Sequence, residues 1–272
     1  MRLEISYRTR YAYDPPVARG LSALRVRPGL KVLEASLRCS PGRVSSTYTD
    51  AWGTTVDIVE FDRLHAVSQF EMRATVETCL QERDDPPTED EWYLYRHDSP
   101  RVRSVAVEPL AWTVGNEGGA WQAVESALAW IPQRFAYQVG ATDAETTIEE
   151  VIGIGSGVCQ DFAHVFLALL RRWGWCARYV SGYLFSTSRE ADRIEAEAMH
   201  AWVEVYRPGA GWVGLDATSG MLADDRYVAV ARGRDYDDVR PVRGIINGKG
   251  RQTQESRLEI LHTAHLSQQQ QQ

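Results

Sequence analysis

The chain lacks the features that mark membrane, secreted and nucleic-acid-binding proteins. No stretch of its 272 residues approaches the ~18 consecutive apolar residues of a membrane-spanning helix. Its first residues, MRLEISYR, carry charges where a secretory signal needs an apolar run. With 30 Lys and Arg against 37 Asp and Glu, the net charge is −7, so the basic excess of nucleic-acid and anionic-membrane binders is missing. We therefore expect a cytoplasmic protein with neither nucleic acid nor membrane as its partner.

Cysteine is scarce and widely spaced. The four cysteines are Cys39, Cys79, Cys159 and Cys176. None forms a C-x-x-C pair, so neither a disulfide framework nor a zinc knuckle is indicated. A metal site could draw on two of these cysteines and two histidines, namely Cys159, Cys176, His164 and His200. No pair among them has the usual spacing of zinc ligands. We predict free thiols in a reducing compartment and no metal or cofactor.

The first part of the chain alternates between apolar and polar residues with a period of two. The clearest apolar positions are Phe70, Met72, Ala74 and Val76. Turn signals such as Pro28-Gly29 and Pro41-Gly42 separate these runs. Alternation broken by frequent turns predicts a small antiparallel β-sandwich domain over residues 1–82.

An acidic, proline-containing run at residues 82–91 interrupts this pattern. Such a composition does not pack as a core, so residues 83–104 are predicted to be a linker. The rest of the chain is predicted to form a core at 105–232, a C-terminal segment wrapping over it at 233–266, and a disordered glutamine-rich tail at 267–272.

The stretch around Cys159 predicts a helix that begins at a cysteine. From Phe162 to Trp173 the apolar residues recur at i, i+3, i+4 and i+7, and Gly174 is the residue type that commonly follows a last helical turn. Cys159 then lies in the first turn, where unpaired N–H groups and the positive end of the helix dipole favour a thiolate over a thiol. This position suits a nucleophile, and it equally suits a buried structural cysteine.

Two strands that follow this helix bring a histidine and an aspartate into reach of one another. They are joined by a short turn, so they should pair as an antiparallel hairpin. One even register sets Tyr206 opposite Trp212. It brings Asp216 diagonally adjacent to His200 on one face, and a shift by two residues brings them directly opposite.

Cys159, His200 and Asp216 together supply a nucleophile, an acid and base, and an orienting carboxylate. Each residue alone has a simpler interpretation: a structural thiol, a satisfied core histidine and a turn-forming aspartate. His164 is a competing base, but five helical residues turn it about 140° away from Cys159. We therefore expect His164 to be a packing residue.

Four stretches resemble the bacterial transglutaminase-like superfamily when taken together. They are GVCQDFAH at 157–164, ARYVSGY at 177–183, HAWVEVY at 200–206 and GWVGLDAT at 211–218. Further upstream, YAYD at 11–14 and RVRP at 25–28 resemble the β region that precedes this core in bacteria. The resemblance covers about residues 1–245. It implies an α+β fold, in which an antiparallel β-sandwich precedes a papain-like core with its catalytic helix packed on an antiparallel sheet.

The resemblance also implies roles for individual residues. Cys159 would be the nucleophile, His200 the general base and acid, and Asp216 the orienting carboxylate. Two departures stand out: Ala217 replaces a common proline after the aspartate, which would loosen that turn, and Arg240 replaces a proline in the segment 233–241. Neither removes a catalytic group.

The expected reaction is attack of Cys159 on an amide or isopeptide carbonyl of a peptide or protein, through a thioester that water or an amine resolves. The backbone N–H of Cys159 is the expected oxyanion donor, with Gln160 and Trp121 as candidates for a second. We favour hydrolysis because no pocket for an acceptor amine can be read from the sequence. An amine-accepting transglutaminase, an acyltransferase with a small thioester donor and a non-catalytic peptide-binding module remain open, since a fold does not select among them.

Overall fold

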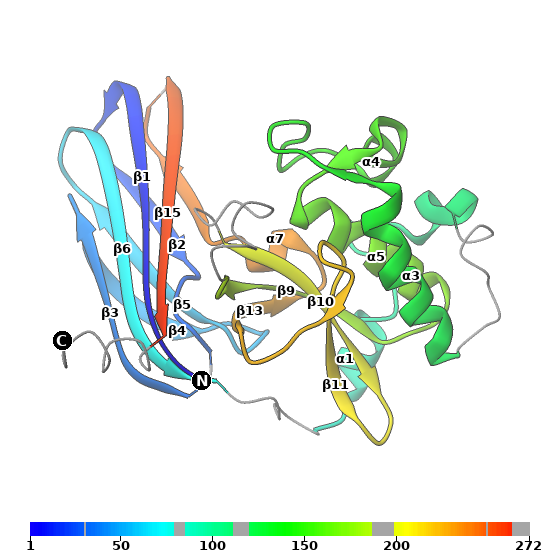
Figure 1. Ribbon diagram of the computed structural model, residues 1–272. Helices are drawn as coiled ribbons and strands as arrows, with labels where there is room; N and C mark the ends of the chain where they lie inside the picture. Colours follow the sequence, from blue (N-terminus) through cyan, green and yellow to red (C-terminus); the bar gives the residue numbers. More distant parts are fainter. Residues whose placement is uncertain (30, 79–84, 111–119, 187–198, 249, 263–272) are drawn as a thin grey trace, which may run out of the picture.

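The computed structural model describes residues 1–29, 31–78, 85–110, 120–186, 199–248 and 250–262. Cys79, the start of the predicted linker and the predicted tail at 267–272 lie outside these ranges. Within them, no helix is both long and apolar enough to cross a membrane. A sandwich of two sheets lies beside a mixed domain of sheet and helices (Figure 1).

The sandwich is built from antiparallel strands, and burial alternates along the long strands β1 and β6. One sheet contains, in spatial order, β15 (Arg251–His262), β1 (Arg2–Val17), β6 (His65–Glu77) and β3 (Val32–Ser40). The other contains β14 (Val242–Ile246), β2 (Gly20–Leu24), β5 (Thr55–Phe61) and β4 (Arg43–Thr49). The apolar positions expected to alternate in β6 are buried. This confirms the predicted N-terminal sandwich.

The C-terminal strands belong to this sandwich, which differs from the predicted wrapping segment at 233–266. β15 pairs with β1 from Leu3↔His262 to Asp14↔Arg251, and β14 pairs with β2. The sandwich therefore combines both ends of the described chain, and β1 gains a neighbour on each side (Figure 1). The alternation that predicted strands in residues 1–82 carries no information on which strand each would pair with.

The predicted linker is also more ordered than expected. Residues 85–104 contain α1 (Glu89–Leu94), which begins with a capping box made by Thr88 and Glu91. Tyr95 follows it and is only 1% exposed. Its ring lies 5.8 Å from that of Trp52 in the sandwich and 5.9 Å from that of Trp212 in the second domain. The segment thus packs against both domains.

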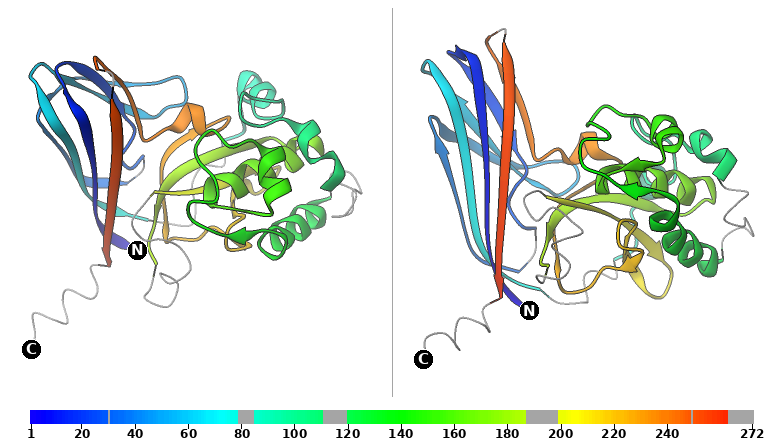
Figure 2. Two further views of the ribbon diagram at one scale, coloured as in Figure 1. Left: turned by 90° about the horizontal axis from the view of Figure 1, so that it is seen from above. Right: turned by 45° about the horizontal axis from the view of Figure 1, so that its top comes forward.

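The second domain has a five-stranded antiparallel sheet. In spatial order its strands are β12 (Met221–Leu222), β11 (Gly211–Asp216), β10 (His200–Arg207), β9 (Ala177–Leu184) and β13 (Tyr227–Gly233). The other elements are η1 (Ser104–Val107), α3 (Trp121–Arg134), β7 (Ala136–Tyr137), α4 (Ile148–Ile154), β8 (Ser156–Gly157), α5 (Cys159–Arg172) and α7 (Tyr236–Val239). Helices α3, α4 and α5 lie on the side of the sheet away from the sandwich (Figures 1 and 2).

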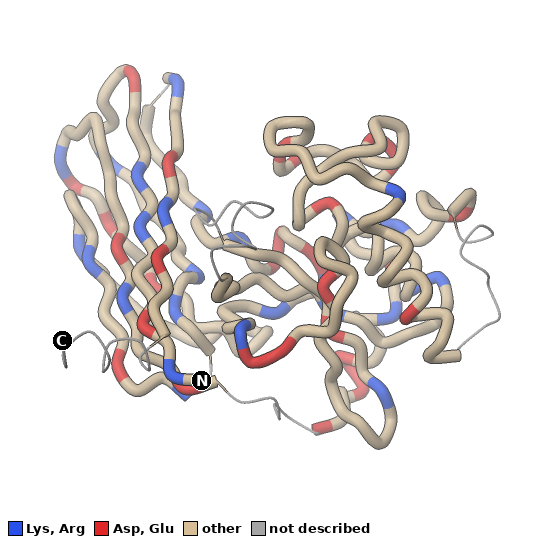
Figure 3. The backbone as a smooth tube through the Cα atoms, viewed as in Figure 1, with Lys and Arg blue, Asp and Glu red and all other residues tan. Residues whose placement is uncertain are grey.

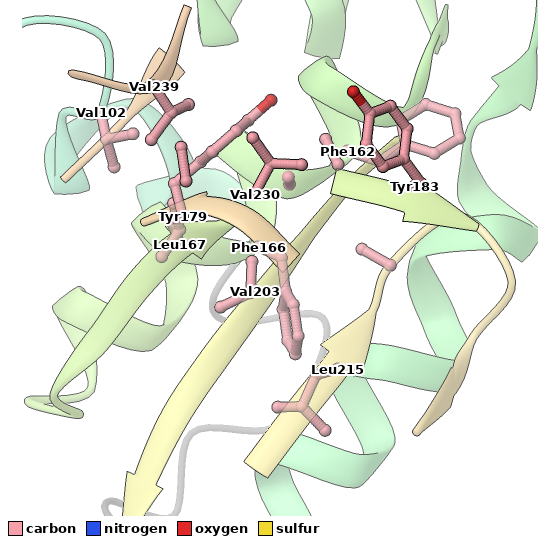
Figure 4. Packing of buried hydrophobic residues seen from close by; sticks show 14 of the residues in the cluster. Val102, Phe162, Phe166, Leu167, Tyr179, Tyr183, Val203, Leu215, Val230 and Val239 are labelled. Carbon is pink, nitrogen blue, oxygen red and sulfur yellow. The ribbon is translucent and has the colours of Figure 1, made fainter. Parts of the chain in front are cut away.

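Helix α5 is the centre of this domain. It begins at Cys159 and ends at Arg172, with Gly174 beyond it at a φ of 79°, as predicted. Phe162 and Phe166 are fully buried and pack over the sheet, among residues such as Val203 (Figure 4). Burying each large apolar side chain contributes roughly 1.5–3 kcal/mol, so this face anchors the helix and fixes where its N-terminus points.

Candidate active site

The first turn of α5 is held by a buried carboxylate. Asp161 accepts hydrogen bonds from the Val158 N–H at 2.8 Å and from the Thr142 hydroxyl at 2.6 Å. The first N–H groups of a helix have no partner within it, so this end of α5 presents donors and a positive dipole end to the half-buried Cys159. The cysteine therefore has a fixed position at a polarised helix terminus.

The chain approaching Cys159 is equally constrained. β8 pairs in parallel with β7, and the Gln138 N–H donates to the Gly157 carbonyl at 2.9 Å. A Cβ atom at Gly157 would lie 2.7 Å from Asp161 Oδ2. Glycine is required here because of this close approach to the carboxylate that holds the first turn.

The hairpin of β10 and β11 brings the histidine and aspartate together. Its register sets Tyr206 opposite Trp212, which is one of the two registers considered from the sequence. His200 begins β10 and Asp216 ends β11, and their side chains meet with Nε2 and Oδ2 3.0 Å apart. His200 is 3% exposed and Asp216 is 0% exposed.

Asp216 is held by more than its histidine. Its carboxylate accepts hydrogen bonds from the Tyr227 hydroxyl at 2.8 Å, the Ser219 hydroxyl at 3.0 Å and the Thr218 N–H at 2.8 Å. The turn that contains Ala217 in place of proline is closed by a bond from the Gly220 N–H to the Asp216 carbonyl at 2.8 Å. Four donors, counting His200, thus fix the carboxylate.

Two of these partners, Ser219 and Tyr227, were not predicted from the sequence. A hydroxyl three residues after Asp216, in a turn, is a local signal that could have identified Ser219. Tyr227 offered no such signal. It lies on β13, which the pattern of alternation cannot place relative to Asp216.

The electrostatics of the pair favour its ionised form. Burial of the imidazole opposes protonation, but the charge and hydrogen bond of Asp216, together with Cys159, outweigh burial and raise the pKa of His200 to about 10. Burial opposes ionisation of Asp216 too, yet His200 and the other donors lower the pKa of Asp216 to about 2. The other ring nitrogen, His200 Nδ1, is buried without a hydrogen-bond partner among the described nitrogen and oxygen atoms.

Each of the two domains matches a known protein family. Residues 110–217 match the transglutaminase-like superfamily, and residues 3–77 match the bacterial transglutaminase-like N-terminal region. The chain belongs to the transglutaminase-like superfamily. The match to the core includes Cys159, His200 and Asp216 and ends before Tyr227.

Relatives of this transglutaminase-like protein include mycobacterial proteins of unknown activity. One from Mycobacterium leprae is 28% identical over 276 residues, covering 92% of this chain and 94% of its own length. Another, from Mycobacterium tuberculosis, is 48% identical over 118 residues, so the match spans only 38% of that relative's length. A protein-glutamine gamma-glutamyltransferase of Pseudomonas aeruginosa is 30% identical over 132 residues, 46% of this chain and 19% of its own.

A solved structure shares the whole fold. The crystal structure of a candidate cysteine protease from Cytophaga hutchinsonii superposes with a TM-score of 0.77 at 23% identity, covering 96% of this chain and 90% of its own. At this identity the likeness establishes the fold, including the arrangement of sandwich and core, and not the reaction. The predicted fold class is thereby confirmed.

Cys159 and His200 both line a pocket of about 270 Å³ in this transglutaminase-like protein. The transglutaminase-like core domain contributes Tyr137, Gln160, Tyr179, Met199 and Tyr236, among others, to its wall. The sandwich contributes Tyr7, Gln254, Ser256 and Leu258. The pocket is therefore formed by both domains. This could not be predicted from the sequence, because the segment 233–266 was expected to wrap over the core.

Of the two candidates for the second oxyanion donor, Gln160 lines the pocket beside Cys159 and Trp121 does not. The indole N–H of Trp121 donates to Glu125 at 2.8 Å, and its ring lies 5.9 Å from that of Trp175, beyond the C-terminal end of α5. Since α5 spans roughly 20 Å, Trp121 is at the wrong end of the helix for this role.

His164 is not placed to serve as the base. Its Nε2 accepts a hydrogen bond from the Tyr236 N–H at 3.2 Å, and its ring packs 5.2 Å from that of Tyr179. Burial lowers the pKa of His164 to about 3, so the ring is neutral and anchors the start of α7. No cluster of three or more potential metal ligands occurs among the described residues.

Proposed function

We propose that this protein is a cysteine-dependent enzyme that cleaves amide or isopeptide bonds in peptides or proteins. The observation that carries the proposal is the buried His200–Asp216 pair, whose histidine lines the same pocket as a cysteine at a helix N-terminus. A charged pair buried at this depth is costly unless it is hydrogen-bonded throughout, and its position beside a thiol gives it a chemical use.

The proposed reaction proceeds in two steps. The Cys159 thiolate attacks the carbonyl carbon, and the oxygen takes up negative charge that the backbone N–H of Cys159 stabilises. As the C–N bond breaks, His200 Nδ1–H protonates the departing amine and leaves a thioester on Cys159. Water then attacks the thioester while His200 takes its proton, which releases a carboxylic acid and restores the Cys159 thiolate beside a protonated His200. Asp216 holds the imidazole by Nε2 and stabilises its charged form.

Transfer to an amine is the second candidate, because one relative is named as a protein-glutamine gamma-glutamyltransferase. It differs from hydrolysis only in the nucleophile that attacks the thioester. We favour water, since the described pocket walls contain no carboxylate that would attract a protonated amine.

The test is to trap the thioester. After incubation with peptides from a cell extract and rapid denaturation, mass spectrometry is expected to find an acyl group on Cys159 that hydroxylamine removes. The adduct should vanish in Cys159→Ala and persist in Cys39→Ala, which removes a cysteine of the sandwich. New amino termini then indicate hydrolysis, and incorporation of added methylamine indicates transfer. An absence of any adduct at Cys159 contradicts both and favours a peptide-binding module.

The cytoplasmic location and the peptide or protein partner remain predictions from the sequence. Fractionation of cells that express the full-length protein would test the location directly.

A further inference from the structure

We infer that the pocket beside Cys159 accepts an uncharged aromatic side chain of the peptide substrate, and that strand β15 of the sandwich forms the wall that selects it. This inference rests on the proposed function, because it names the substrate residue that the same site would hold. It would make the sandwich part of the substrate-binding surface.

The sandwich side of the pocket is built by two paired strands. Tyr7 of β1 and Leu258 of β15 are directly opposite in the register, and both line the pocket. The buried Tyr7 ring lies 5.7 Å from that of Tyr183 in β9. Tyr183 also donates its hydroxyl hydrogen to the Val26 carbonyl at 2.7 Å. These contacts fix the wall against the catalytic domain.

Aromatic rings also line the core side of the pocket. Tyr137, Tyr179 and Tyr236 belong to β7, β9 and α7 respectively. The rings of Tyr179 and Tyr236 lie 6.5 Å apart in an edge arrangement. With Tyr7 they surround the space next to Cys159. Aromatic pairs prefer such offset and edge contacts, so another ring fits this environment better than a flexible aliphatic or charged chain.

Beyond Cys159 and His200 themselves, the described walls offer no charge for an ionic substrate group. Apart from His200, none of the described lining residues is acidic or basic. Burial raises the pKa of Tyr7, Tyr179 and Tyr236, so these phenols stay neutral. A carboxylate or ammonium group would lose hydration here without gaining a partner.

Charged and uncharged side chains alternate along β15, which keeps the charges out of the pocket. Its charged side chains, Arg251, Glu255, Arg257 and Glu259, occupy odd positions. Its even positions carry the uncharged lining residues Gln254, Ser256 and Leu258. Successive residues of a strand face opposite sides, so the charges point away from the pocket. Figure 3 shows acidic and basic residues interspersed along these strands.

The polar residues of this wall form hydrogen bonds with one another and with Thr9 of β1. Ser256 donates to Thr9 Oγ1 at 3.1 Å, and the Gln254 amide donates to Thr9 at 3.4 Å and to Ser256 at 3.3 Å. They form a neutral polar rim beside Leu258. The wall therefore combines an apolar contact with uncharged hydrogen-bonding groups, as pockets for a neutral side chain do.

One strand supplies a matched pair of variants. Leu258 lines the pocket, whereas Leu261 is 54% exposed and lines a groove on the other side of the sheet. Leu258→Asp places a negative charge in the proposed wall, and Leu261→Asp places the same charge outside it. Ser256→Asp is a second variant in the wall, for use if Leu258→Asp lowers the melting temperature.

The experiment compares three reagents that alkylate Cys159 in the full-length protein. They are N-acetyl-phenylalanine chloromethyl ketone, its glutamate counterpart and iodoacetamide, each normalised to its rate with free cysteine. We expect the phenylalanine reagent to exceed the glutamate reagent at least about tenfold, a difference of about 1.4 kcal/mol. In Leu258→Asp or Ser256→Asp, the ratio of the phenylalanine rate to the iodoacetamide rate should fall by a similar factor, and in Leu261→Asp it should not change.

Equal normalised rates for the two ketones would overturn the aromatic assignment. An unchanged ratio in both folded wall variants would overturn the role of β15. Failure of the proposed function is a separate outcome, because iodoacetamide would then alkylate wild-type Cys159 no faster than a free thiol.

Discussion

At the scale of single residues, the site depends on how Asp216 controls His200. Burial alone would keep the imidazole neutral, and the carboxylate 3.0 Å away reverses this preference. Tyr227 and Ser219 hold Asp216 so that its charge stays directed at the ring. The protonation state of His200 is therefore a property of this cluster.

The first prediction concerns the variant Asp216→Asn. In the wild type, the raised pKa means that the imidazolium persists through neutral pH and is lost only as pH rises through about 10. Without the carboxylate charge, burial dominates, and the ring should lose its proton below the ordinary value of 6.5. Nitrogen-15 NMR of the imidazole as a function of pH measures this directly. Titration of His200 at the same pH in both proteins would contradict the account.

The second prediction concerns Gly157. A methyl group there would meet Asp161 Oδ2 at 2.7 Å and displace the carboxylate from Val158 and Thr142. We expect Gly157→Ala to lower the free energy of unfolding by about 1–3 kcal/mol and to slow alkylation of Cys159. Urea denaturation and iodoacetamide kinetics measure the two effects.

Gly153 provides the matched control. It lies in helix α4, where an added Cβ meets nothing within 4 Å. Gly153→Ala should therefore stabilise the protein by roughly 0.5–1 kcal/mol. A destabilisation of equal size in both variants would show that the crowding at Gly157 is not the cause.

Cys159, His200 and Asp216 could be selected from the sequence because helix position and hairpin alternation are local patterns. The structure brings these three residues to one site. Tyr227 could not be selected, because its contact with Asp216 depends on the spatial order of strands in the sheet. Trp121 was predicted as a candidate oxyanion donor but lies near the C-terminal end of α5. Nothing in its local sequence indicates which end of α5 it packs against.

At the scale of secondary-structure elements, the hairpin of β10 and β11 is held by a buried ionic cluster beyond the site. Glu204 of β10 accepts hydrogen bonds from Arg178 Nε at 2.7 Å and from Arg232 Nε at 2.9 Å. The Arg178 guanidinium also stacks 3.8 Å from the centre of the Trp212 ring. This cluster ties β9, β10, β11 and β13 together at the end of the sheet away from His200.

The third prediction is that Glu204→Gln destabilises the fold. Removing one member of a buried ionic cluster typically costs about 3–5 kcal/mol, because the remaining charges lose their partner. Glu259→Gln is the control: its partner Arg257 is 70% exposed, so we expect a change within about 0.5 kcal/mol. Urea denaturation at neutral pH compares the two.

The contribution of Glu204 also depends on pH. Burial raises its pKa, but Arg178 and Arg232 outweigh burial and lower it to about 2. Its stabilisation is therefore complete above the ordinary value of 4.5 and is lost as pH falls towards 2. The gap in stability between wild type and Glu204→Gln should narrow over that range, and a constant gap would contradict the assignment.

At the scale of the whole molecule, the two ends of the described chain close one sandwich. β15 covers one edge of β1, and β14 covers one edge of β2. From the sequence, the segment 233–266 was expected to wrap over the core, because pairing between distant strands leaves no periodic mark in either one. The same pairing brings β15 to the pocket that contains Cys159.

The fourth prediction tests whether β15 is an integral strand. Ile260 is half-buried, pairs opposite Ile5 and packs against the main core. Ile260→Asp should lower the free energy of unfolding by about 1–3 kcal/mol, because it places a charge in an apolar environment. Leu261→Asp, on the opposite face, should change it by no more than about 0.5 kcal/mol. Equal effects would mean that this strand is not packed as described.

The central claim is that Cys159 is an activated nucleophile. Burial raises the pKa of Cys39 to about 11 and that of Cys176 to about 12, so both should remain unreactive thiols at neutral pH. The decisive measurement is the rate of iodoacetamide alkylation at each cysteine, resolved by peptide mass spectrometry, in wild type and in His200→Ala. We predict that Cys159 reacts at least about tenfold faster than a free thiol in the wild type and loses this advantage in the variant. A wild-type rate no faster than that of a free thiol, unchanged by His200→Ala, would contradict the account.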